Sequence, residues 1–159
     1  MAQLRTETRE HAKAARLAKR AHAEGLGIDE QFISHLVDRF YGSIRQDDLL
    51  GPIFSQRITD WPSHLERMRS FWRSVMFNSG EFSGNPMLKH MSIPGLKAEH
   101  FERWLELFYS ALRGCEAEAA GISLVGTRAR SIAESLLIGI NTKRDGLAGA
   151  KAGKDLPYV

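Results

Sequence analysis

Apolar side chains recur every three to four residues between about residues 29 and 142, the spacing that places them on one face of a helix. No segment of this region alternates apolar and polar residues as a half-buried strand does. The pattern predicts four longer helices and one short helix, over about 29–46, 60–78, 85–93, 97–113 and 116–141. We therefore expect an all-α fold.

Capping and helix-breaking residues support these boundaries. Asp29 and Asp60 each precede an apolar-periodic run and can accept hydrogen bonds from first-turn N–H groups. Asn85 can cap the short helix in the same way, and Pro94 requires that helix to end before it. Residues 50–54, Leu-Gly-Pro-Ile-Phe, indicate a compact turn between the first two long helices.

The two ends of the chain are more basic than its middle. Residues 1–24 contain six Lys and Arg residues against three acids, residues 143–159 contain four against two, and the middle contains twelve against fourteen. Leu4 and Leu17 are the only Val, Ile or Leu residues of the first 24, so little apolar surface is present to dock this segment. We expect a basic, flexible or helical extension over 1–28, a domain over 29–142 and a disordered Gly- and Lys-rich tail over 143–159.

Composition argues against several classes of function. Because acids outnumber bases in the middle of the chain, we expect no concentrated basic surface for nucleic acid there. No apolar run approaches the roughly 20 residues of a membrane span. Cys115 is alone and cannot form an intrachain disulfide, which favours the cytoplasm. A transit peptide is a further interpretation of the basic extension, although Glu7 and Glu10 are atypical of one.

The histidines form no recognisable zinc motif. The six of them lie at positions 11, 22, 35, 64, 90 and 100, with no HExxH sequence and no short-spaced Cys/His cluster. The chain also has no P-loop and no dinucleotide-binding glycine motif. Candidate chemistry must therefore come from single side chains on different helices.

His90 occurs late in the short helix that Asn85 opens, and apolar residues surround it. These neighbours are Met87, Leu88, Met91 and Ile93. A neutral imidazole beside an apolar cavity can donate a ring-nitrogen lone pair to haem iron. Considered alone, a partly buried structural histidine is the commoner role for such a residue.

A second imidazole lies on an apolar face of the helix predicted over 60–78. His64 shares that face, at helical spacing, with Met68, Phe71, Trp72 and Val75. Such a stripe fits either an ordinary core or a cofactor wall. Tyr41 and Trp104 place one hydrogen-bond donor each on apolar faces of two other helices. Three polar groups on three helices favour a polar spot within an apolar cavity, which is typical of small-ligand sites.

In combination these residues resemble the truncated haemoglobins, specifically their third group. The resemblance covers about residues 29–142. Its elements, in chain order, are Phe40-Tyr41, Leu49-Leu50-Gly51-Pro52-Ile53-Phe54, Trp61 with His64, Phe71-Trp72, Gly84-Asn85-Pro86 leading to His90, and Trp104. The chain lacks the paired-glycine motifs of the other truncated groups, and its two ends lie outside the family pattern.

The resemblance implies a truncated globin-like two-over-two helical sandwich around haem b. It implies that His90 is the proximal iron ligand, and that Tyr41, His64 and Trp104 are the distal groups that stabilise a bound ligand. The wider set of haem contacts that it implies is Met68, Phe71, Trp72, Met91, Leu96, Phe101, Trp104 and Phe108.

The function implied is binding of oxygen or another small ligand, such as NO, CO, cyanide or sulfide. The iron would be penta- or hexacoordinate and the distal pocket polar. NO-detoxifying or peroxidase-like activity also suits such a pocket and would require an electron donor. The alternative is a haem-free helical sensor or interaction domain that keeps the globin fold, in which the aromatic residues are ordinary core.

Overall fold

Every regular element that the structure describes is helical. The computed structural model describes the backbone of residues 1–159 and all side chains except those of Leu147, Ala148 and Ala150. The elements in chain order are α1 (Ala2–Gly25), α2 (Glu30–Gln46), α3 (Gly51–Arg57), α4 (Trp61–Phe77), α5 (Pro86–Met91), α6 (Ala98–Arg113), α7 (Ala119–Asp145) and the 3-10 helix η1 (Gly146–Lys151). None of the described helices combines the length and the apolar character needed to cross a membrane.

The predicted cap residues begin three of these helices. The Asp29 carboxylate accepts a hydrogen bond from a first-turn N–H of α2 at 2.7 Å, and the Asp60 carboxylate does the same for α4 at 3.2 Å. The Asn85 side-chain oxygen accepts from a first-turn N–H of α5 at 3.0 Å. Each bond satisfies a donor that the first helical turn leaves unpaired. The expected starts of these helices are confirmed.

The compact turn expected at residues 50–54 is wrong, because most of this segment lies in helix α3. The Asp47 carboxylate accepts from the N–H groups of Leu49 and Leu50, at 3.2 and 3.0 Å, and so forms the corner before the helix. Arg103 of α6 donates to the same carboxylate at 2.8 Å and ties this corner to the body. A proline occupies the first turn of α3, where its missing N–H costs no hydrogen bond.

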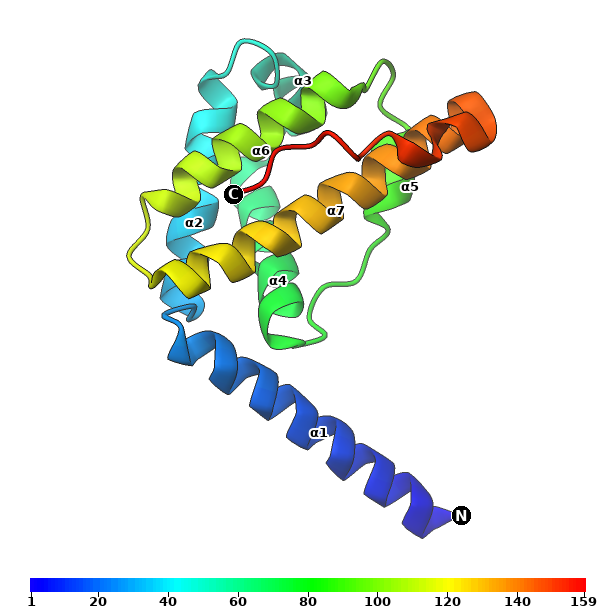
Figure 1. Cartoon of the computed structure of the whole chain (residues 1–159). Helices are drawn as coiled ribbons and strands as arrows, with labels where there is room; N and C mark the ends of the chain where they lie inside the picture. The colour runs from blue at the N-terminus through cyan, green and yellow to red at the C-terminus, as the bar shows by residue number, and fades with distance from the viewer.

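The body consists of two pairs of helices packed across each other. α2 packs on α4, α6 packs on α7, and α2 also contacts α6, which joins the two pairs. Figure 1 shows α6 and α7 crossing in front of α2 and α4. The expected two-over-two helical sandwich is therefore confirmed. Its core contains large, almost completely buried side chains, among them Phe40, Ile44, Leu105, Phe108 and Leu137.

Helix α1 projects from this body. Figure 1 shows it leaving one end of the sandwich and extending into solvent. Residues 1–18 are exposed along their whole length, and only the last turns of α1 contact the body, chiefly at α4. There Ala23 is buried, and the Arg20 guanidinium lies over the Phe77 ring, 4.8 Å from its centre. The outer part of α1 is thus a helix without a packing partner within the chain.

The C-terminal tail packs against the body, contrary to the disorder expected from its composition. Its last residues run back between α6 and α7 (Figure 1). Leu156 is 2% exposed, and the Tyr109 hydroxyl donates to the Pro157 carbonyl at 2.8 Å. Arg130 of α7 donates to the Leu156 carbonyl at 3.3 Å and lies 3.7 Å from the centre of the Tyr158 ring. One apolar side chain and one arginine therefore anchor a segment whose composition is typical of disorder.

Leu156→Ala should lower the free energy of unfolding by about 2 kcal/mol, the low end of the cost of truncating a buried leucine. Chemical denaturation followed by circular dichroism measures this change. Asp155→Ala is the matched control, because Asp155 directly precedes Leu156 and its side chain is exposed. This substitution should change the free energy of unfolding by less than about 0.5 kcal/mol. Equal free energies of unfolding for the two variants would contradict the docking of the tail.

Candidate functional site

One face of α4 carries the expected stripe of apolar residues with an imidazole at its start. His64 is half-buried in the first turns of the helix. The residues that follow it on this face are Met68, Phe71, Trp72 and Val75. Trp72 is 3% exposed, whereas the other three are partly buried. The stripe therefore merges with the core at Trp72 and leaves the rest of the face partly uncovered.

Tyr41 of α2 meets His64 edge to face. Their ring centres are 5.1 Å apart and the rings are nearly perpendicular, at 87°. Tyr41 is 6% exposed, and burial raises the pKa of its hydroxyl well above the ordinary value, so the hydroxyl stays protonated and can donate a hydrogen bond. Phe54 and Trp61 also contact the Tyr41 ring, at 5.9 and 6.2 Å between ring centres. The structure thus brings two of the three predicted distal groups together.

The His64 imidazole has a buried nitrogen without a hydrogen-bond partner. No donor or acceptor within the described part of the chain pairs with its Nε2 atom. Burial lowers the pKa of His64, and the positive charges of Arg67 and Lys89 lower it further. The imidazole is therefore neutral at pH 7. Its unpartnered nitrogen marks a place where a bound group could supply the missing hydrogen bond.

The orientation of His90 is fixed from within the short helix α5. Its Nδ1 atom lies 2.6 Å from the Pro86 carbonyl oxygen. A carbonyl oxygen can only accept, so in the neutral imidazole Nδ1 carries the hydrogen and Nε2 keeps the lone pair. A histidine that ligates a metal through Nε2 needs this arrangement, because the hydrogen bond sets both the tautomer and the direction of the ring.

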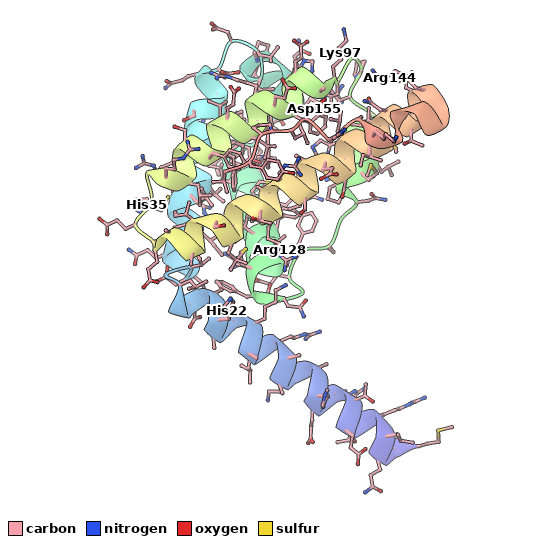
Figure 2. All side chains as sticks on the ribbon, viewed as in Figure 1. His22, His35, Lys97, Arg128, Arg144 and Asp155 are labelled. Carbon is pink, nitrogen blue, oxygen red and sulfur yellow. The ribbon has the colours of Figure 1, made fainter. Side chains whose placement is uncertain are left out.

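Helix α5 is held in place by α7. Met87 and Met91 pack at Gly139 of α7, where an added side chain would overlap the Met87 sulfur. After the C-terminal end of α5, Arg144 of α7 donates a hydrogen bond to the Leu96 carbonyl at 2.7 Å. Figure 2 shows Arg144 near the end of α7, beside the start of α6. α7 therefore supports the short helix and the segment that follows it.

The third predicted distal group, Trp104, lies in an aromatic stack. The rings of Trp72, Phe108 and Trp104 stack in series, with successive centres 5.0 and 5.3 Å apart. Phe40 meets Trp104 edge to face at 5.2 Å and also contacts Tyr41 at 4.9 Å. None of the aromatic contacts described joins Trp104 directly to Tyr41, so Phe40 is the link between them.

The two sides of the site come from helices in different parts of the fold. α4 packs on α2 and α1, whereas α5 packs on α7, and the described parts of α4 and α5 make no extensive contact with each other. The charge of Lys89 nevertheless acts on His64, so α5 faces this part of α4. Of the remaining predicted wall residues, Leu96 and Phe101 are buried and Met91 is partly buried. The site is thus bounded by two helices that each carry one of the predicted histidines.

Sequence reasoning missed two cations at this site. Arg67 lies over the Phe82 ring, 5.7 Å from its centre, and Phe82 packs on the apolar stripe of α4. The loop between α4 and α5 is therefore folded back onto α4. Arg67 follows His64 by three residues, and Lys89 directly precedes the other histidine. This spacing was the available signal that both cations lie at the site.

Comparison with known proteins agrees with this architecture. A model of the family described as bacterial-like globin matches residues 23–126. The group 3 truncated hemoglobin ctb of Campylobacter jejuni is 35% identical over 89 residues, which span 54% of this chain and 70% of that protein. The crystal structure of the group III truncated hemoglobin from Campylobacter jejuni matches with a TM-score of 0.65 at 32% identity, covering 69% of this chain and 88% of that chain. This chain belongs to the bacterial-like globins, among the truncated haemoglobins of group III.

Membership of this family makes the chain a haem globin that takes small diatomic ligands. The resemblance predicted from the sequence is confirmed, and haem binding is favoured over the haem-free alternative. Most of α1 precedes the residues that match the globin family. The globin fold therefore accounts for the two-over-two body, and α1 is an addition to it.

Arg67→Gln should raise the pKa of His64 toward its ordinary value of about 6.5, because the substitution removes one of two positive charges that lower it. Proton NMR of the haem-free protein measures the titration of the ring. Arg69→Gln is the matched control, since Arg69 lies on the same helix but pairs with Asp38 at 2.7 Å. A His64 pKa that is unchanged in Arg67→Gln, or that rises equally in both variants, would contradict the geometry described.

The same shift fixes the sign of a pH effect on stability. Because the pKa of His64 is lower in the folded protein, the unfolded chain takes up this proton first as the pH falls through about 6.5. The contribution to stability is present above that pH and is lost below it, down to the pKa of the folded state. The free energy of unfolding of the haem-free protein should fall below pH 6.5, and less steeply in Arg67→Gln.

Proposed function

We propose that this globin holds haem b between α4 and α5, with His90 as the proximal iron ligand. The observation that carries this proposal is the hydrogen bond from His90 Nδ1 to the Pro86 carbonyl, which leaves Nε2 with its lone pair. The unpartnered Nε2 of His64 on the facing helix supports it, because such a buried atom fits a site that a further group completes. His90 would hold the haem iron, and the bound haem would supply a metal atom that takes a small ligand.

Two cations suit the acidic edge of the porphyrin. Haem b carries two propionate carboxylates, and cations at the rim of a site stabilise such groups. Arg67 of α4 and Lys89 of α5 both lie close enough to His64 to lower its pKa. We expect these two side chains to neutralise the propionates, one from each side of the site.

Tyr41 and Trp104 supply hydrogen-bond donors on the ligand side. Burial keeps the Tyr41 hydroxyl protonated, and an indole N–H can only donate. Such donors stabilise a ligand that carries partial negative charge, as oxygen does in a ferrous globin. His64 contacts Tyr41 and is only half-buried, a position that suits a gate for ligand entry.

These distal groups favour oxygen binding with slow release over bulk oxygen transport. They also suit NO detoxification, peroxidase-like turnover, or binding of cyanide or sulfide, since each places negative charge near the donors. The redox activities would draw electrons from a separate donor. A cytoplasmic location fits this proposal, because a reducing compartment keeps the unpaired Cys115 thiol reduced.

His90→Gly should abolish proximal coordination, because it removes the one bond proposed between protein and iron. Added imidazole should restore the wild-type spectrum by filling the space that the side chain leaves. Absorbance and resonance Raman spectra of the haem-loaded ferrous protein measure both effects. His35→Gly is the matched control, since His35 is exposed in the middle of α2 and carries the same helix-weakening change.

This experiment distinguishes a wrong proximal residue from a protein that does not bind haem. An unchanged ferrous spectrum in His90→Gly would assign the proximal bond to another residue. A wild-type protein that ignores added hemin would instead support the haem-free alternative.

Tyr41→Phe should speed oxygen dissociation by roughly ten- to a hundredfold, since a hydrogen bond to a charged group contributes about 1.5–3 kcal/mol. The ring remains and only the hydroxyl is lost, so haem content should not change. Stopped-flow kinetics measure the rates. Carbon monoxide carries little negative charge when bound and serves as the control ligand, whose dissociation should change much less.

In Tyr41→Phe, the Trp104 indole N–H can replace the lost hydroxyl as the hydrogen-bond donor to the bound ligand. The double variant Tyr41→Phe/Trp104→Phe should then show the full effect. Unchanged oxygen dissociation in both variants would remove the two residues from the distal side, and equal acceleration for both gases would indicate a loosened pocket.

A further inference from the structure

All six cations of α1 lie on one face of the helix. They are Arg5, Arg9, Lys13, Arg16, Lys19 and Arg20, and we call them the basic stripe. At 3.6 residues per turn their positions fall within about 120° of the helix circumference and extend over about 22 Å. The three glutamates of α1 lie outside this arc. The net charge of the extension is thus concentrated on one side.

The outer part of the basic stripe is available to a partner. Its four outer members, Arg5, Arg9, Lys13 and Arg16, are exposed. The described ion pairs of α1 involve only Arg20, which meets Glu24 at 2.6 Å and Glu30 at 3.3 Å. Burial lowers the pKa of Lys19, and the positive charge of nearby Arg128 lowers it further. Figure 2 shows Arg128 on α7 near the root of α1, so the body adds positive charge there.

We propose that the basic stripe docks on the phosphate backbone of a nucleic-acid duplex, independently of base sequence. An α-helix is about 10–12 Å across and fits a major groove of about 12 Å. Four of the six cations are arginines, whose planar guanidinium matches two phosphate oxygens at once. Charge complementarity carries this proposal, because binding to a phosphate backbone requires little else from a protein surface.

Other polyanionic partners need features that α1 lacks. Insertion into an anionic membrane requires bulky apolar residues opposite the cations. That opposite face carries Glu7, Ala14, Ala18 and Ala21, while the exposed Leu4 and Leu17 lie on different sides of the helix. A helix that binds an acidic protein groove needs apolar anchors along one side as well. Because α1 offers these two partners charge alone, we expect it to bind both of them more weakly than it binds a duplex.

The placement of α1 allows docking without obstructing the haem site. α1 contacts α4 near Phe77, at the opposite end of that helix from His64. The rest of α1 points away from the body (Figure 1). Acids outnumber bases in residues 25–142, so the body would not follow the helix onto a phosphate surface. The proposal is therefore independent of the ligand chemistry proposed above.

Fluorescence anisotropy with a labelled 20-base-pair DNA duplex of arbitrary sequence tests the proposal on the full-length protein. The stripe variant carries Arg5→Gln, Arg9→Gln, Lys13→Gln and Arg16→Gln, which keep helix propensity and side-chain length. The charge-matched control carries Arg57→Gln, Arg113→Gln, Lys143→Gln and Lys151→Gln, all exposed positions of the body and tail. Helicity and the Soret band of both variants should match the wild type.

The wild type and the control should bind alike, and the stripe variant should bind at least about tenfold more weakly at 50 mM salt. A plot of log association constant against log salt should have a slope of about −3.6 for the wild type, because the four outer cations each neutralise one phosphate and each neutralised phosphate contributes about −0.9. Equal losses in the two variants would reduce the effect to net charge and overturn the proposal. The proposal is also overturned if the wild type does not bind the duplex. The same holds if it binds poly-glutamate, or vesicles that contain anionic lipid, more tightly than the duplex.

Discussion

The candidate site depends on α5, a helix too short to be stable without support from the rest of the fold. Isolated helices shorter than about 12 residues are marginal in water, and α5 has six residues. Asn85 caps it, and the Pro86 carbonyl orients His90 within it. Its outer support comes from α7, through the packing at Gly139 and the hydrogen bond from Arg144. α7 therefore fixes the position of the helix that carries His90, although it contributes none of the predicted site residues.

Local signals made most of the body predictable from sequence. The caps at Asp29 and Asp60 and the helical spacing of apolar residues located the longer helices of the sandwich. α3 was not predicted, because seven residues are too few to show the helical period of apolar side chains. A Leu-Gly-Pro run is also typical of a turn. The order of the tail escaped because its partners lie 26 and 48 residues away in the chain, at Arg130 and Tyr109. Composition carries no information about such distant contacts.

The same distinction applies within the site. His64 and His90 could be selected as candidates because each is a single imidazole among apolar residues at helical spacing. Lys89 was missed because its effect on His64 exists only when α5 faces α4, whereas Arg67 was missed although it follows His64 by three residues on the same helix. Trp104 was predicted from its polarity on an apolar face, and its stack with Phe108 is a contact four residues apart within α6. The contacts of this pair with Trp72 of α4 and Phe40 of α2, however, depend on how the three helices cross. Pairs of residues on different helices are thus the part of the site that a single sequence does not reveal.

The polar groups of the site are a cost that the surrounding aromatic packing offsets. A buried nitrogen without a partner, such as His64 Nε2, costs about 1–3 kcal/mol. Each aromatic pair contributes about 0.5–1.5 kcal/mol beyond its buried area, and the His64 ring packs against Tyr41 and Trp61, at 5.1 and 5.8 Å between ring centres. A domain selected only for stability would replace the imidazole with an apolar side chain. Its presence, opposite a histidine whose lone pair is kept free by Pro86, is the reason to place ligand chemistry between α4 and α5.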